Sequence, residues 1–115
     1  MNPLIRRLGT AGTLEVVRRR TGTLQRVPVN VLEIAGNRYL VSMRGQTHWV
    51  RNLREAGHCT LHRRGRRCAY LAVELFGERR PPIIAAYGDR WRVRRFFEKM
   101  PDPADHPVFR LDPAD

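Results

Sequence analysis

The sequence has few cysteines, lysines and serines, and it has no long hydrophobic segment. Its 115 residues include two cysteines, one lysine (Lys99) and one serine (Ser42). Two cysteines are too few for a scaffold held by disulfides. The longest apolar runs, such as residues 81–87, are too short to span a bilayer. Arg6 and Arg7 are not followed by the apolar stretch of a secretory signal. We therefore expect a soluble, cytoplasmic domain with no transmembrane segment.

The sequence also lacks the motifs of enzymes that catalyse reactions with their own side chains, without a cofactor. Ser42 has no Gly-x-Ser-x-Gly surroundings, and the acidic residues form no close pair on a predicted rigid element. The glycine-rich signatures of dinucleotide and P-loop sites are absent. His58, Cys59 and His62 lie close together in the sequence, but neighbours in a strand point to opposite faces, and nothing completes a ligand set. We expect no metal site, so any chemistry must come from a bound cofactor.

Positive charge is the dominant property of what the sequence does contain. Arginine and lysine number 22 against 11 acidic residues, which gives a formal net charge of +11. Residues 1–70 hold 14 arginines and three glutamates, whereas residues 71–115 hold eight bases and eight acids. The whole excess therefore lies in the first 70 residues. It indicates a surface that meets an anion: nucleic acid, a membrane surface or a phosphorylated ligand.

Periodicity and turn residues predict a single domain over residues 1–115. Residues 1–12 form a short N-terminal extension with a short helix at residues 3–8. Alternating apolar residues predict strands at residues 14–17, 27–34, 38–43, 58–63, 66–75 and 107–111. One helix runs from Thr47 as N-cap to Gly57 as its left-handed end, and a second covers residues 83–97. Hairpins dominate, so the expected class is mainly β (α+β), an antiparallel barrel with two short packing helices.

The hairpin at residues 58–75 also predicts how the cysteines lie. With Arg64 and Gly65 as a two-residue turn, residue 59 faces residue 70 and residue 61 faces residue 68. Cys59 and Cys68 are then diagonal neighbours roughly 7–8 Å apart. This separation is too large for an unstrained disulfide.

Two stretches are candidates for ligand binding. In the first, residues 18–26, Gly22 permits a sharp turn between two strands. The stretch contains four arginines: Arg18, Arg19, Arg20 and Arg26. Together with the exposed backbone amides of a turn, these side chains suit a phosphate or several carboxylates. A solvated hairpin tip is the plainer interpretation of this stretch.

The second stretch is residues 41–53, where a strand leads through a glycine-containing loop into a helix. The free backbone N–H groups at the start of that helix, together with Arg44, suit an anion or the edge of a ring. Trp49 in that helix, taken alone, fits the core better than it fits a ligand site.

The order of these features resembles the deazaflavin-dependent nitroreductase family, a branch of the split β-barrel flavin-binding proteins. Members carry a basic Gly-Arg-Lys-(Ser/Thr)-Gly loop followed by Arg and Pro, then a Trp-x-x-Asn-Leu helix and a terminal Pro-Val-Phe-type strand. The matching sequences here are Arg-Arg-Arg-Thr-Gly at residues 18–22, Trp-Val-Arg-Asn-Leu at residues 49–53 and His-Pro-Val-Phe at residues 106–109. The resemblance extends over residues 14–113, nearly the whole chain.

The resemblance implies a split β-barrel that binds coenzyme F-420, a deazaflavin with a phosphate and an oligoglutamate tail. Members pass hydride from the reduced coenzyme to a small electrophile such as a quinone or a nitro compound. The residues implied for the phosphate and tail are Arg19, Arg20 and Arg26. Those implied around the ring system are Pro28, Val29, Ser42, Arg44, His48, Trp49 and Asn52. Tyr87 and Trp91 are the implied substrate contacts, although nitroreductases of the family have a cluster of tyrosines where this chain has Tyr87 alone. No catalytic residue is assigned.

Several alternatives stay open on the sequence alone. FMN could replace the deazaflavin, because a basic loop can hold either phosphate. The chain could be a non-catalytic flavin- or deazaflavin-binding module. A basic nucleic-acid-binding barrel is a third option, suggested by the arginines at residues 63–67, but no strand carries the clustered aromatics that base stacking uses. We expect a small-molecule substrate and no nucleic acid, with a homodimer or a monomer equally compatible with the sequence.

Overall fold

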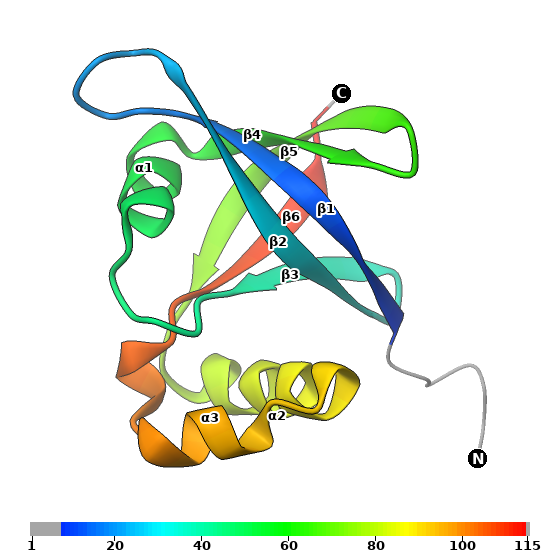
Figure 1. The fold of residues 1–115 in the computed structure, drawn as a ribbon, viewed down its shortest axis with the longest axis vertical. Coiled ribbons are helices and arrows are strands. Elements are labelled where there is room, and N and C mark those ends of the chain that lie inside the picture. Colours follow the sequence, from blue (N-terminus) through cyan, green and yellow to red (C-terminus); the bar gives the residue numbers. More distant parts are fainter. Residues whose placement is uncertain (1–7, 115) are drawn as a thin grey trace.

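Six antiparallel strands close into a barrel in the order β1-β2-β3-β6-β5-β4 (Figure 1). The computed structural model describes residues 8–114. The strands are β1 (Leu8–Val17), β2 (Leu24–Ile34), β3 (Asn37–Val41), β4 (His58–Arg63), β5 (Arg66–Leu75) and β6 (Val108–Pro113). Pairing of β1 with both β2 and β4 closes the ring. The predicted class, a mainly β split antiparallel barrel, is confirmed.

The β4–β5 hairpin follows the prediction in bounds and register. Arg64 and Gly65 both have positive φ, 53° and 73°, as in the two-residue turns whose twist matches that of the strands. Cys59 lies opposite Tyr70, which leaves Cys68 one diagonal step away. Cys59 is buried, Cys68 is exposed, and both are free thiols.

The strand limits at the two ends of the chain differ from the prediction. β1 begins at Leu8 instead of residue 14, so residues 8–12 of the expected N-terminal extension belong to the barrel. This stretch is rich in glycine and has little hydrophobic alternation, and pairing with β2 holds it in the sheet. The helix expected at residues 3–8 lies outside the described residues except for Leu8, which is in β1. The last strand extends to Pro113, two residues beyond its predicted end.

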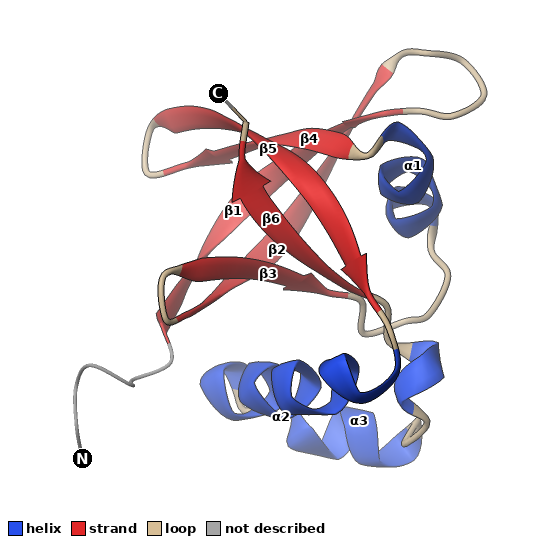
Figure 2. Cartoon of the chain, turned by 180° about the vertical axis from the view of Figure 1, so that it is seen from behind, coloured by secondary structure: helices blue, strands red, loops and turns tan. Residues whose placement is uncertain are grey.

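Helices cover two parts of the barrel surface (Figures 1 and 2). Helix α1 (His48–Ala56) packs beside β1, β4 and β5, while α2 (Arg80–Trp91) and α3 (Arg94–Lys99) lie together across one end. Two short 3-10 turns, η2 (Gly77–Arg79) and η3 (Pro103–Asp105), flank this pair. The limits predicted for α1 are correct: Thr47 precedes it, and Gly57, with φ of 74°, ends it by donating its N–H to the carbonyl of Leu53. None of the helices within residues 8–114 is both long and apolar enough to cross a membrane.

The single helix predicted at residues 83–97 is wrong. Arg92 has φ of 58° and ends α2, and the N–H of Val93 then donates to the carbonyl of Gly88 at 2.9 Å. The turn brings Phe97, which is buried, edge-on against Tyr87, with ring centroids 6.1 Å apart. A continuous helix would carry Phe97 away from this contact. The barrel therefore has three short packing helices instead of two.

Two hydrophobic clusters make up the core and leave a space between the helices. The first fills the barrel and packs against α1 through Val50 and Leu53. The second lies under α2 and α3, where Ile84, Tyr87 and Phe97 meet strand residues such as those at 32, 41 and 108. Because α1 and α2 are anchored by different clusters, the barrel wall between them is not covered by a helix.

Candidate functional site

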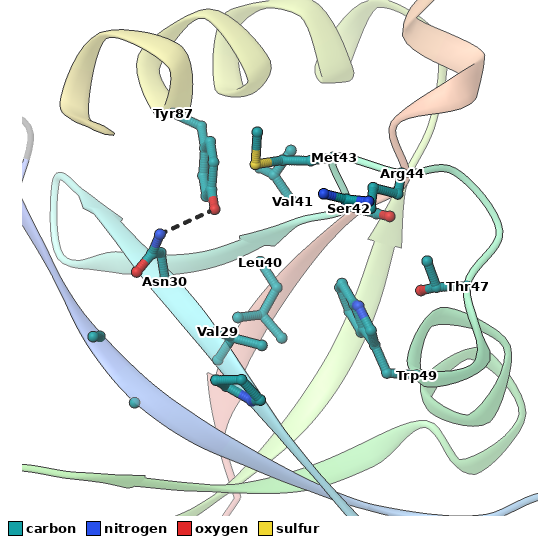
Figure 3. A pocket seen from close by; sticks show the side chains of 13 residues that line it. Val29, Asn30, Leu40, Val41, Ser42, Met43, Arg44, Thr47, Trp49 and Tyr87 are labelled. Carbon is teal, nitrogen blue, oxygen red and sulfur yellow. Dashed lines mark hydrogen bonds between the residues drawn. The ribbon is translucent and has the colours of Figure 1, made fainter. Parts of the chain in front are cut away.

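An apolar cavity of about 360 Å³ lies on the uncovered wall between α1 and α2 (Figure 3). It is lined by residues of β1, β2, β3, the loop after β3 and both helices: Ala11, Gly12, Pro28, Val29, Asn30, Leu40, Val41, Ser42, Met43, Arg44, Thr47, Trp49 and Tyr87. Val29 and Leu40 form part of its wall from neighbouring strands, and the Trp49 ring closes it from α1 (Figure 3). Packing on Phe109, with ring centroids 6.2 Å apart, supports the indole. A cavity of this size accommodates a planar ring system.

The loop between β3 and α1 forms the polar side of this apolar cavity. Ser42 is buried, and its hydroxyl donates to the carbonyl of Gly45 at 2.7 Å. Thr47 precedes α1, but its side chain makes no cap hydrogen bond, and its buried Oγ1 has no partner. Hydrogen-bonding groups shielded from water normally have a partner. Thr47 thus brings to the cavity lining a hydroxyl that has no partner among the described residues.

Among the residues that line this cavity, Tyr87 is the one with an acidic side chain, its phenolic hydroxyl. Its hydroxyl accepts a hydrogen bond from Nδ2 of Asn30 at 3.4 Å (Figure 3). Burial raises the pKa of Tyr87, and the bond from Asn30 offsets part of that rise. The phenol is therefore neutral at physiological pH and keeps its proton at the cavity.

An arginine-lined cavity of about 320 Å³ adjoins the loop between β1 and β2. Its lining consists of Arg18, Arg19, Arg20, Thr21, Gln25, His48 and Asn52. Arg18 stiffens the loop by donating from Nη1 to the carbonyl of Leu24 at 2.6 Å, whereas Arg20 is exposed and has no partner among the described residues. The loop therefore presents a free guanidinium on a fixed backbone, an arrangement that suits phosphate and carboxylate groups.

Asn52 of α1 fastens this loop to the helix. Its Oδ1 accepts from the backbone N–H of Arg19 at 3.1 Å and from Nη1 of the same residue at 2.7 Å. Its Nδ2 donates to Oε1 of Gln25 at 2.8 Å. The amide is buried, and these three bonds occupy its oxygen and one of its two N–H groups.

Helix α1 and strand β2 connect the two cavities. Trp49 lines the apolar cavity, while His48 and Asn52 line the arginine-lined one. Along β2, Gln25 belongs to the arginine-lined cavity and residues 28–30 to the apolar one. A ligand with a planar ring at one end and several negative charges at the other could occupy both.

The structure gathers ten of the twelve sequence-predicted residues at these two cavities. Those at the apolar cavity are Pro28, Val29, Ser42, Arg44, Trp49 and Tyr87. Those at the arginine-lined cavity are Arg19, Arg20, His48 and Asn52. The sequence analysis missed Asn30 and Thr47. Asn30 shares a strand face with Pro28, and this alternation was the signal available for it, whereas the missing partner of Thr47 has no signal in the sequence.

Arg26 and Trp91 line neither cavity. The guanidinium of Arg26 pairs with Glu15, Nε to Oε2 at 3.1 Å, in a cluster where His62 and Arg67 also approach that buried carboxylate. Trp91 packs its ring on Tyr87, with centroids 4.7 Å apart, and lies close against Gly9. Both side chains make contacts within the fold, although that of Arg26 is still 69% exposed.

No family model and no curated protein matches the sequence, but solved structures share its fold. A protein of unknown function from Agrobacterium tumefaciens gives a TM-score of 0.73 at 18% identity over 97% of this chain, which spans only 51% of that protein. An F-420-H2-dependent reductase gives 0.72 at 18% identity over 89% of this chain and 93% of its own. HutZ, the heme storage protein from Vibrio cholerae, gives 0.70 at 14% identity over 91% and 82%. These likenesses define the class as split β-barrel proteins. At such identities they establish the fold alone.

Proposed function

We propose that the chain is an oxidoreductase that binds coenzyme F-420 and passes hydride from its reduced form to a small electrophile such as a quinone or a nitro compound. The observation that carries the proposal is a pair of cavities that α1 and β2 both help to line, one apolar and ring-sized, the other lined by three consecutive arginines. A deazaflavin with a phosphate and a polycarboxylate tail matches both cavities: its ring system suits the apolar one, and its phosphate and carboxylates suit the arginine-lined one. The likeness in fold to an F-420-H2-dependent reductase supports the same assignment.

The residues present fit such a coenzyme. Pro28, Val29 and Trp49 offer apolar contacts to a ring system, and the unpartnered hydroxyl of Thr47 would bond a polar atom at the ring edge. Arg19 and Arg20 would hold the phosphate and the carboxylates. The positive charge of the first 70 residues then has a role in attracting the ligand.

When bound, the reduced deazaflavin supplies the hydride, so the chain needs no nucleophile of its own. Apolar side chains of the cavity, such as Leu40 and Met43, exclude water from the reacting atoms. Arg44 brings positive charge to the cavity lining, where it favours an acceptor that gains negative charge. The neutral hydroxyl of Tyr87 holds a proton within the same lining and can donate a hydrogen bond to the acceptor.

A fluorescence titration with oxidised F-420, run beside FMN at two salt concentrations, tests the binding. We expect saturable binding that prefers F-420 and weakens as salt rises, since the tail is anionic. Arg20→Ala should weaken F-420 binding at least tenfold. The matched control is Arg51→Ala, which removes an exposed arginine of α1 that lines neither cavity. Equal losses in the two variants, or no binding at all, would contradict the proposal.

Turnover separates an enzyme from a binding module. With reduced F-420, we expect oxidation of the coenzyme to depend on an added quinone or nitroaromatic. Tight binding without acceptor-dependent oxidation would favour a non-catalytic module instead. Preference for FMN in the titration would keep the site but change the cofactor.

A further inference from the structure

A second basic cavity, the arginine mouth, opens at the end of the barrel near the β4–β5 turn. Its volume is about 690 Å³, and its lining is Glu33, Arg38, Leu61, Arg63, Arg64, Arg66, Cys68 and Tyr70. None of these residues lines either cavity of the proposed cofactor site. In both ribbon views the β4–β5 hairpin points to the opposite side of the barrel from the β1–β2 loop (Figures 1 and 2). The arginine mouth is thus spatially separate from that site.

Two of its four arginines are held by the fold. Arg63 donates from Nη1 to Oε1 of Glu33 at 2.7 Å and to Oγ1 of Thr10 at 3.1 Å. The guanidinium of Arg38 lies 5.2 Å from the ring centroid of Tyr70. These contacts fix two cations at the edge of the cavity, and Glu33 is the sole carboxylate among its described lining residues.

The other two arginines are unpaired. The side chains of Arg64 and Arg66 are exposed and make no hydrogen bond or ion pair with any described residue. The lining carries four guanidinium groups and one carboxylate, and this excess of positive charge attracts an anion. Arg64 also stands at a turn position with φ of 53°, where glycine or asparagine is the favoured residue. A cation is therefore present where both charge and backbone geometry favour another residue.

We infer that the arginine mouth binds a small polyphosphate, either free or as the phosphate chain of a nucleotide. Guanidinium groups bind phosphate oxygens in pairs and remain charged at every physiological pH. The cavity volume lies within the range of small-molecule sites. A single-stranded nucleic acid is disfavoured because the one aromatic side chain of the lining, Tyr70, is buried and covered by Arg38, which leaves no stacking platform.

Thermal unfolding at constant ionic strength tests this inference with inorganic tripolyphosphate, ATP and a single-stranded oligonucleotide as probes. Tripolyphosphate should raise the Tm of the wild-type chain by several degrees, because a ligand that binds the native state alone stabilises it. The double variant Arg64→Gly, Arg66→Ala should fold with an unchanged or higher Tm and should bind tripolyphosphate at least tenfold more weakly. Stronger binding of ATP would identify a nucleotide, and equal binding would identify the phosphate chain alone; both support the inference.

Arg20→Ala distinguishes this site from the proposed cofactor site. That variant should weaken F-420 binding at least tenfold but keep most of the response to tripolyphosphate, whereas the double variant should keep F-420 binding and lose most of that response. The two proposals therefore fail separately. A tripolyphosphate response that Arg20→Ala removes and the double variant keeps would place the anion in the arginine-lined cavity and overturn the inference. So would the absence of any Tm shift, or tighter binding of the oligonucleotide than of either phosphate probe.

Discussion

The side-chain amide of Asn52 connects α1, the β1–β2 loop and the start of β2. It is 3% exposed, and it bonds to Arg19 twice and to Gln25 once. We expect Asn52→Ala to lower the free energy of unfolding by about 1–3 kcal/mol, because the backbone N–H of Arg19 and the amide of Gln25 lose a buried partner. Urea unfolding measures the change. The neighbouring exposed Arg51→Ala should stay within about 0.5 kcal/mol of wild type.

The same amide also holds Arg19 in the loop that carries the arginines of the candidate site, so Asn52→Ala should weaken ligand binding as well as stability. Asn52→Asp keeps the acceptor for Arg19 but replaces the donor to Gln25 with a carboxylate oxygen. Its loss of stability should therefore be smaller than that of Asn52→Ala or similar to it, never larger. An Asn52→Ala variant as stable as Arg51→Ala would show that solvent replaces these bonds and that the amide is not an anchor.

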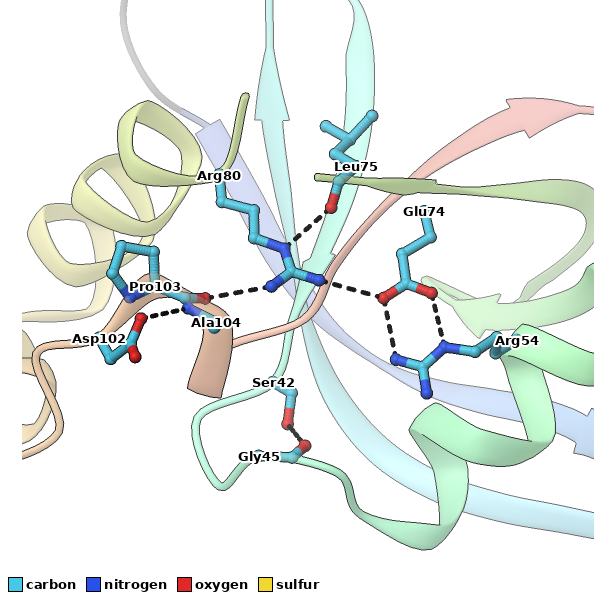
Figure 4. A network of polar contacts seen from close by, with 9 residues as sticks. All are labelled: Ser42, Gly45, Arg54, Glu74, Leu75, Arg80, Asp102, Pro103 and Ala104. Carbon is cyan, nitrogen blue, oxygen red and sulfur yellow. Dashed lines mark hydrogen bonds and ion pairs between the residues drawn. The ribbon is translucent and has the colours of Figure 1, made fainter. Parts of the chain in front are cut away.

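An ion-pair network joins α1, β5 and α2 (Figure 4). Glu74 accepts two hydrogen bonds from Arg54, at 2.6 and 2.9 Å, and faces Arg80 at 3.3 Å. The side chains of Glu74 and Arg80 are 7% and 10% exposed, while that of Arg54 is 42% exposed. Arg80 also donates to the carbonyls of Leu75 and Pro103. The helices that carry Trp49 and Tyr87 are thus tied to the same strand.

Removing the carboxylate of this network should cost far more than removing its exposed partner. Glu74→Gln leaves the Arg80 guanidinium buried without a counter-charge, and we expect a loss of about 3–5 kcal/mol in the free energy of unfolding. Arg54→Ala breaks a partly solvated pair and should cost about 1 kcal/mol or less. Glu55→Gln, an exposed carboxylate on α1, is the control. Similar losses for Glu74→Gln and Arg54→Ala in urea unfolding would contradict this ranking.

An element could be predicted from the sequence where residues near one another in the chain determine it, and not where distant residues do. Helix α1 and the β4–β5 hairpin were predictable because Gly57 and Gly65 set their ends locally. The break at Arg92 was not, because no glycine or proline stands there and distant packing of Phe97 on Tyr87 favours it. The first residues of β1 escaped prediction for a similar reason, since their pairing with β2, not their own pattern, keeps them in the sheet.

The candidate site shows the same division. The resemblance named ten residues that meet at the two cavities, but it could not foresee that Arg26 turns to the buried Glu15. Nor could it foresee that Trp91 packs against Gly9. Both outcomes depend on contacts with other strands or helices. The arginines at residues 63–67 were visible in the sequence, but the cavity that they form with Arg38 requires the closed barrel.

The charge of the whole molecule has an unusual dependence on pH. Apart from Lys99, every basic residue other than histidine is an arginine, so the positive charge persists well above the pH at which lysines lose theirs. Alkaline changes in stability must then come mainly from buried acids of high pKa. Burial raises the pKa of the Cys59 thiol from 9.0 to about 12, and burial also raises the pKa of Tyr87.

We therefore expect the stability of the chain to fall as pH rises above about 9. In the unfolded chain the Cys59 thiol ionises near its ordinary value of 9.0, while in the folded chain it keeps its proton up to about 12. The unfolded state thus binds fewer protons in this window, and the slope of the free energy of unfolding approaches about −1.4 kcal/mol per pH unit. Urea unfolding at pH 8, 9 and 10 measures this slope.

Two cysteine variants identify the group responsible. Cys68→Ala, which removes the exposed thiol, should keep the wild-type slope. Cys59→Ala should be less stable than wild type at neutral pH, and its free energy of unfolding should fall much less between pH 8 and 10. A Cys59→Ala variant with the wild-type slope would show that another group, with Tyr87 first in line, governs the alkaline loss.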